Sequence, residues 1–247
     1  MLSSYKGPIN AAIIGATGGI GRALINELTA LSNINHLYTL SRKTYEHDTK
    51  MEEAILHKLE FDLLDQESIQ QAANGITHPL NLIIIATGHL HDASQMPEKN
   101  WDALDAEAMR KSFALNTIGP ALLLRYLLPK LGTNGKNICA VLSARIGSIS
   151  DNRAGGWYSY RASKAALNMI VKTAGIELKR KNKAATLMGL HPGTVDTNLS
   201  SPFQNMVPKS QLFTAEQSAQ KLLKVINEKS REDTGKCFAH DGTEITP

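Results

Sequence analysis

The 247-residue sequence contains only two cysteines, and it has neither a long apolar run nor a strong charge of one sign. Cys139 and Cys237 each lie in a short apolar segment typical of a strand, so we expect buried, reduced thiols rather than a disulfide framework. No apolar stretch approaches the ~18 residues of a membrane-spanning helix. The polar N-terminus does not resemble a signal peptide, and these absences together favour a cytoplasmic protein without a membrane span.

The net charge of +4 is mild. Much of the visible basic clustering is the run Lys179-Arg-Lys-Asn-Lys183, at the expected C-terminal end of a helix, where cations interact favourably with the helix dipole. We therefore expect a solvated helix end rather than a nucleic-acid site. There is no repeat, low-complexity tract or interdomain linker, and the chain length suits one α/β domain over residues 1–247.

Strand-like and helical segments alternate along the chain. Strands are expected at residues 9–14, 36–41, 55–60, 80–86, 136–143, 184–190 and 236–239. Helices are expected at 19–31, 66–74, 103–131, 158–181 and 215–228, and the third could break at Gly119-Pro120. The alternation predicts a doubly wound, Rossmann-like α/β domain, in which a mostly parallel seven-stranded sheet carries helices on both faces. In such a sheet the ligand binds at the carboxyl edge of the strands.

A glycine-rich loop separates the first expected strand from the first expected helix. Gly15, Gly19 and Gly21 give the spacing G-x-x-x-G-x-G, with Thr17 and Ile20 between them. The order strand, glycine loop, helix is typical of a site where a dinucleotide pyrophosphate lies at a helix N-terminus. Glycine also lets backbone N–H groups come close to phosphate oxygens. We expect these five residues to contact a dinucleotide, and the alternative is a glycine turn without a ligand.

The second expected strand ends in Ser41 and Arg42. At this place an acidic residue would hold the ribose 2′-hydroxyl of NAD, whereas an arginine accommodates the 2′-phosphate of NADP. The chain has no acid there, but it has a hydroxyl and a planar guanidinium that suits a phosphate. The pair predicts NADP(H) in preference to NAD(H), and a solvated basic loop is the alternative.

Tyr160 and Lys164 lie four residues apart in a long segment with helical spacing. Residues at that spacing share one helix face. An isolated tyrosine ionises near pH ~10, and a cation one turn away favours the phenolate and lowers the pKa, so the phenol can exchange protons near neutral pH. By itself the pair is common in helices, and Tyr158, whose i+4 neighbour is Ala162, is expected only to pack.

Together with the glycine loop, the Tyr160 and Lys164 pair resembles the short-chain dehydrogenase/reductase family over nearly the whole chain. Phe61-Asp62-Leu63, Asn116 and the Pro-Gly-x-Val-x-Thr turn that ends at Thr197 match further motifs of that family. Ala86-Thr87-Gly88 takes the place of its Asn-Ala-Gly turn and lacks the asparagine. The cofactor contacts that the resemblance implies are Asp62, Leu63, Ala86, Thr87, Gly88, Tyr160, Lys164, Pro192, Gly193, Val195 and Thr197.

Within the family, residues 142–158 look most like the C-factor and sniffer-type carbonyl reductase group. The resemblance implies reversible hydride transfer between NADP(H) and a small carbonyl or alcohol substrate. Tyr160 would exchange the proton, Lys164 would grip the nicotinamide ribose, and Asn116 would hold a water that links Lys164 to solvent. It also implies a homodimer or homotetramer paired through long helices. The alternative is an NADP(H)-binding signalling protein of C-factor type with little or no turnover.

The catalytic serine is expected among the residues that follow the fifth strand. The family has paired serines before x-x-Gly and uses the second, whereas this chain has Ser143-Ala144 before Arg145-Ile-Gly147. Ala144 could therefore occupy the aligned position. We expect Ser143, directly after the buried strand, to bind the substrate oxygen, and Ser148 is the rival.

Two loops would border the substrate. Residues 196–213 contain two prolines and several apolar side chains, and they follow the turn expected at the nicotinamide, so we expect a lid over an apolar pocket. His89 and His91 follow the fourth strand. No further metal ligands accompany them in the sequence, so we expect loop histidines near a cleft rather than a metal site.

Overall fold

Seven parallel strands form the central sheet of this protein, in a computed structural model that describes residues 1–43, 56–93 and 95–247. The strand order is β3-β2-β1-β4-β5-β6-β9, and every neighbouring pair runs parallel. The strands are β1 (Ile9–Ile14), β2 (Ile34–Ser41), β3 (Leu56–Glu60), β4 (Leu82–Ile85), β5 (Asn137–Leu142), β6 (Ala185–His191) and β9 (Cys237–Ala239). The predicted parallel α/β sheet is confirmed, although residue 55, expected to begin the third strand, lies outside the described residues.

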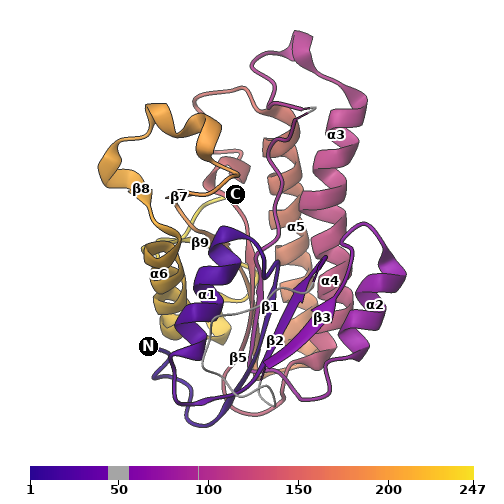
Figure 1. The fold of residues 1–247 in the computed structure, drawn as a ribbon, viewed down its shortest axis with the longest axis vertical. Helices are drawn as coiled ribbons and strands as arrows, with labels where there is room; N and C mark the ends of the chain where they lie inside the picture. The colour runs from indigo at the N-terminus through magenta and orange to yellow at the C-terminus, as the bar shows by residue number, and fades with distance from the viewer. Residues whose placement is uncertain (44–55, 94) are drawn as a thin grey trace.

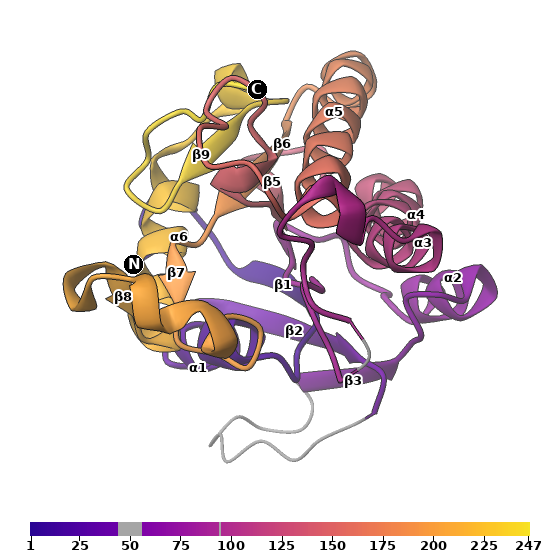
Figure 2. The same ribbon diagram turned by 90° about the horizontal axis from the view of Figure 1, so that it is seen from above.

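Helices cover both faces of this sheet, as Figures 1 and 2 show. One face carries α1 (Gly19–Thr29) and α6 (Ala215–Glu228), which pack against each other. The other carries α2 (Gln66–Asn74), α3 (Ala106–Phe113), α4 (Gly119–Leu127) and α5 (Tyr158–Lys181). The last turn of α5 contains Lys179, Arg180 and Lys181, so this basic cluster does lie at a helix end.

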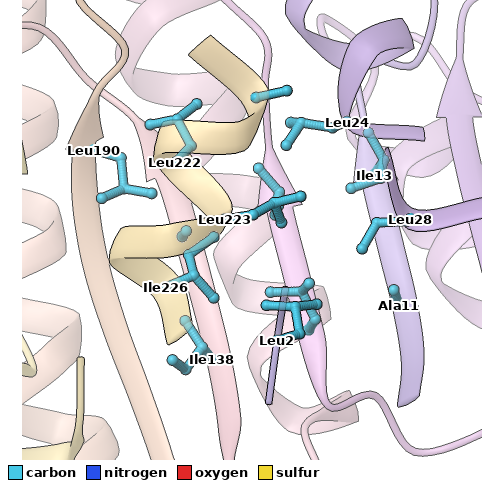
Figure 3. Close-up of a cluster of buried hydrophobic side chains, with 14 of the residues drawn as sticks. Leu2, Ala11, Ile13, Leu24, Leu28, Ile138, Leu190, Leu222, Leu223 and Ile226 are labelled. Atoms are coloured by element: carbon cyan, nitrogen blue, oxygen red, sulfur yellow. The ribbon is translucent and has the colours of Figure 1, made fainter. Parts of the chain in front are cut away.

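Two apolar cores lie between the sheet and its helix layers. Figure 3 shows the first, where Leu24 and Leu28 of α1 and Leu223 and Ile226 of α6 meet strand residues such as Ile13. The second lies beneath α2, α4 and α5. Because both faces of the sheet are covered, β4 and β5 are buried at every position, as the apolar runs Leu82–Ile85 and Ile138–Leu142 suggest.

The helix expected at residues 103–131 is divided differently from the prediction. A short 3-10 turn at Trp101–Ala103 precedes α3, and α3 continues through a π-helical segment (Ala114–Ile118) into α4. The break considered at Gly119-Pro120 is wrong, because Pro120 lies in the first turn of α4, where its missing N–H is tolerated. The π-helical segment carries Asn116, and such segments often occur at functional sites.

A second small sheet was not expected from the sequence. β7 (Thr194–Val195) pairs in parallel with β8 (Leu212–Phe213), and between them lie two short 3-10 helices. Strands of two residues are too short to carry a periodic pattern. The pair ties together the two ends of the segment expected to form a lid. None of the helices in the described ranges is long and apolar enough to cross a membrane.

Candidate active site

The glycine loop between β1 and α1 leaves its backbone open to a ligand. Gly15 has a φ of +88°, and a Cβ there would lie 3.0 Å from the Ala86 backbone. A Cβ on Gly21 would lie 2.2 Å from the Gly15 carbonyl oxygen. Thr17 and Gly19 are exposed, and Gly18 caps α1 without a side chain. The first N–H groups of α1 are therefore available for an anion.

Other expected cofactor residues converge on this loop. A Cβ on Gly19 would lie 2.7 Å from Cγ2 of Thr197, so the glycine loop touches the turn after β6. A Cβ on Gly88 would lie 3.9 Å from Nζ of Lys164. The Thr87 hydroxyl is buried and has no hydrogen-bond partner in the described part of the chain. The close approach of Gly19 to Thr197 and an unpaired buried hydroxyl among the described residues fit a dinucleotide at this edge.

The other expected cofactor contacts lie at or just after the ends of β2 and β3. Ser41 is buried at the end of β2 and donates its hydroxyl to the Lys43 carbonyl at 2.7 Å, whereas Arg42 is exposed. Asp62 accepts the Leu64 N–H at 2.9 Å and so turns the chain after β3. Leu63 lies under Gly119, where a Cβ would approach it within 2.5 Å. Among the described residues Arg42 is exposed, and its guanidinium is accessible to a phosphate.

Tyr160 and Lys164 lie in the first two turns of α5. Lys164 is buried, and its Nζ donates a 3.0 Å hydrogen bond to the Leu142 carbonyl at the end of β5. The same Nζ lies 5.9 Å from the centroid of the Tyr160 ring. Gly147 has no room for a Cβ, which would lie 2.8 Å from the Lys164 backbone, so the loop after β5 packs directly on this helix.

Burial shifts the pKa values of both groups. It raises the pKa of Tyr160 to about 12 and lowers the pKa of Lys164 to about 8. The expectation that Lys164 lowers the tyrosine pKa is therefore wrong, because burial of the phenol raises that pKa. With this pKa Tyr160 holds its proton at neutral pH.

Glu98 anchors the start of α5, a role that no sequence pattern indicated. Its side chain is buried and accepts hydrogen bonds from the Ser159 N–H and hydroxyl, while its carbonyl accepts the Trp157 N–H at 2.5 Å. Trp157 has a φ of 52°, a left-handed conformation that follows two left-handed glycines. The contact joins residues about 60 positions apart, so no local pattern could reveal it. It fixes the turn that presents Tyr160.

Asn116 occupies the π-helical segment and is fully buried. Its Oδ1 accepts the His89 N–H at 2.8 Å, and its Nδ2 donates to the His89 carbonyl at 2.8 Å and to the Ser163 hydroxyl at 3.2 Å. Asn116 therefore joins the loop after β4 to α5. Its expected role in holding a water stays a prediction.

The two candidate serines have partners within the protein. Ser143 follows β5 and donates its hydroxyl to Oδ1 of Asn168 on α5 at 2.5 Å. Ser148 donates to the Thr246 carbonyl near the C-terminus. Within the described residues neither hydroxyl is hydrogen-bonded to Tyr160. The preference for Ser143 remains a prediction.

Aromatic side chains border Tyr160 on the lid side. The Trp157 ring centroid lies 6.2 Å from that of Tyr160 and 4.7 Å from that of Phe203, which belongs to the segment between β7 and β8. His91 packs edge-on against Phe203 at 5.6 Å, and its Nε2 lies 3.1 Å from the Asn198 carbonyl. The sequence indicated Phe203 and His91 as cleft residues but not Trp157. The contacts join the loop after β4, the start of α5 and the expected lid.

These features define a parallel α/β protein of the dinucleotide-binding class, with a Tyr–Lys pair at its ligand edge. The family model of the short chain dehydrogenases matches residues 10–207, and the chain belongs to this family of oxidoreductases.

Known relatives fit that assignment. A 1-hydroxy-2-glutathionyl-2-methyl-3-butene dehydrogenase of Rhodococcus sp. (strain AD45) is 31% identical over 182 residues, 74% of this chain and 76% of the relative. The C-signal protein of Myxococcus xanthus is 34% identical over 148 residues, 59% of this chain and 84% of the relative. The NADPH-bound carbonyl reductase from chicken fatty liver has a TM-score of 0.81 at 25% identity, covering 98% of this chain and all of that one (100%). The carbonyl reductase Sniffer of D. melanogaster shares the fold, with a TM-score of 0.80 at 23% identity over 97% of this chain and 100% of its own.

Proposed function

We propose that this protein is an NADP(H)-dependent carbonyl reductase with the reversible alcohol dehydrogenase activity. The observation that carries the proposal is the position of Tyr160 and Lys164, which lie at the same sheet edge as Gly88 and the unpaired Thr87 hydroxyl. A phenol that keeps its proton at neutral pH is suited to donate it to a carbonyl oxygen. The relatives named above support a redox reaction but leave the substrate open.

In the proposed reaction the bound dihydronicotinamide supplies the hydride that reaches the carbonyl carbon. Tyr160 donates its phenolic proton to the oxygen as negative charge develops there. Lys164 stabilises the phenolate that remains. Its Nζ, which now donates to the Leu142 carbonyl, would donate to the ribose hydroxyls instead. Asn116 holds the loop after β4 against α5 through its hydrogen bonds to His89 and Ser163. The proposed water beside Asn116 passes a proton from solvent back toward Lys164. Ser143 is the proposed hydroxyl donor to the same substrate oxygen.

Arg42 supports the choice of NADP(H). It is exposed at the end of β2, at the ribose position of this fold, and the buried Ser41 hydroxyl shapes the same turn. A guanidinium can bind a 2′-phosphate through two parallel hydrogen bonds. The chicken carbonyl reductase was solved with NADPH, which is consistent with this choice.

The segment at residues 196–213 is the proposed substrate lid of a single catalytic domain. Its two ends are tied by β7 and β8, and Phe203 meets Trp157 beside the tyrosine. Such a segment can close over a substrate and exclude water. We also propose a homodimer or homotetramer, supported by the exposed Met169 and Ile176 on α5. The two free cysteines suit a reducing compartment, so cytoplasmic location remains part of the proposal.

A second candidate function is that of an NADP(H)-binding signalling protein. It is favoured by the likeness to the C-signal protein and by the fact that Ser143 and Ser148 both have protein partners. The test is NADPH oxidation with small aldehydes, ketones and diones, next to NADPH binding measured by fluorescence. Turnover supports the reductase, whereas tight binding without turnover across the panel supports the signalling protein.

A further inference from the structure

Three histidines from separate segments meet at the end of the sheet opposite the cofactor edge. His36 is near the start of β2, His57 is near the start of β3, and His78 precedes β4. All three side chains are half-buried. One ring nitrogen of each lies within 4.8 Å of the corresponding nitrogens of the other two. No residue of this cluster takes part in the proposed reductase site.

The spacing of the nitrogens approaches that of metal ligands. His36 Nδ1 and His57 Nε2 are 3.1 Å apart. Two imidazoles bound to one tetrahedral ion at ~2.0–2.1 Å place their nitrogens ~3.3 Å apart. The third nitrogen lies within 4.8 Å of the other two, so it must move by up to about 1.5 Å to complete the same set. His36 and His78 stack at 3.7 Å with planes 14° apart, so the His78 ring must tilt for both to point at one ion.

Tyr38 contacts two of the three histidines. Tyr38 is fully buried, and its hydroxyl oxygen lies 2.6 Å from His78 Nδ1. When Nδ1 carries the proton of this hydrogen bond, Nε2 of the same ring keeps its lone pair and is the ligand atom. The Tyr38 ring also stacks on His57 at 4.4 Å. A hydroxyl on the second ring nitrogen is the kind of outer contact that fixes tautomer and orientation in metal sites.

We propose that His36, His57 and His78 form a binding site for one divalent transition-metal ion of the zinc and cobalt type. Imidazole nitrogen is a preferred ligand of these ions. Water would complete the coordination, because the cluster is only half-buried. The ion would join β2, β3 and the segment before β4, and so stabilise this side of the sheet.

The test is titration of the full-length, metal-free protein, with any affinity tag removed, with Co²⁺ followed by visible absorption. We expect one ion per chain, a tetrahedral cobalt spectrum and a dissociation constant below about 10 μM. His36→Gln, His57→Gln and His78→Gln should each weaken binding at least about tenfold, and Tyr38→Phe should weaken it by roughly 10- to 100-fold. His91→Gln is the matched control and should bind as the unmutated protein does.

Thermal unfolding with Zn²⁺ or with EDTA gives a second measurement that requires no variant. Added Zn²⁺ should raise the unfolding temperature of the unmutated protein, and EDTA should reverse the rise. The proposal is overturned if cobalt binds only weakly or at no defined stoichiometry, if binding survives the loss of His78, or if His91→Gln removes it. These outcomes are independent of NADPH turnover.

Discussion

Tyr160 experiences two opposing influences at the scale of a single side chain. The cation of Lys164 favours its phenolate, whereas burial favours the neutral phenol, and burial dominates. Burial also lowers the pKa of Lys164 to about 8, so this lysine is less fully protonated near neutral pH than an exposed lysine. A residue pair in the sequence therefore identifies the chemistry but not the protonation state.

Tyr160→Phe should lower the turnover number at least about a hundredfold while NADPH still binds, because only the acidic hydroxyl is removed. Steady-state kinetics and fluorescence titration measure the two effects. Tyr158→Phe is the matched control and should change turnover much less. A Tyr160→Phe enzyme with near-normal turnover would remove this residue from the mechanism.

Arg42→Ala should weaken NADPH binding by on the order of 1.5–3 kcal/mol, the value of charge-assisted hydrogen bonds, and should barely change NADH binding. Titration with both cofactors makes the comparison. Equal losses for the two would mean that Arg42 does not contact a 2′-phosphate.

Ser143→Ala should lower turnover about a hundredfold or more, since a hydroxyl donor to a developing oxyanion contributes roughly 2.7–4 kcal/mol. Ser143 directly follows Leu142, whose carbonyl receives Lys164, whereas the Ser148 hydroxyl is bound near the C-terminus. Ser148→Ala should therefore have the smaller effect on turnover, with NADPH affinity intact in both variants. The reverse ranking would assign the role to Ser148.

At the scale of elements, the start of α5 depends on a residue outside the helix. Trp157 precedes the helix in a left-handed conformation, and no side chain of its own caps the helix. Glu98 accepts the Ser159 N–H instead, and Arg161 donates to the Gly156 carbonyl at 2.9 Å. The first turn of the catalytic helix is thus held from both sides.

Glu98→Ala should lower the free energy of unfolding by roughly 1–3 kcal/mol, because it leaves the buried Ser159 donors without an acceptor. Denaturant unfolding measures this change. Glu98→Gln keeps one acceptor oxygen and should lose less. Glu107→Ala is the control, since that side chain is exposed on α3 and should change stability by less than about 0.5 kcal/mol. Equal losses at both positions would exclude a special role for Glu98.

At the scale of the whole molecule, acid sensitivity follows from the half-buried His191 at the end of β6. Burial, with a smaller contribution from the neighbouring His240, lowers the pKa of His191 from 6.5 to about 4. Between these pH values the unfolded chain binds more protons than the folded one, so stability falls as the pH drops from 6.5 to 4.

This loss should reach roughly 2–3 kcal/mol for His191, since one pKa unit corresponds to about 1.4 kcal/mol. Unfolding free energies measured at pH 7 and pH 4.5 test it. His191→Gln removes the titrating ring, so the variant should lose less stability over this interval. An unchanged pH dependence in that variant would assign the acid sensitivity to other groups.

The sequence alone determined the architecture and the central residues of the candidate site. Alternating apolar runs and helical patterns predicted the parallel sheet, because a strand covered on both faces must be apolar throughout. The glycine loop and the Tyr160–Lys164 spacing are local, so they too could be read along the chain.

Only the tertiary structure decided what depends on contacts between distant segments. Glu98 capping α5, Trp157 beside Phe203 and the meeting of His36, His57 and His78 join residues that no periodicity connects. Burial, which sets the pKa values of Tyr160 and Lys164, is likewise a property of the packed molecule. Local propensity acts over a few residues, whereas desolvation and long-range hydrogen bonds exist only once the chain has folded.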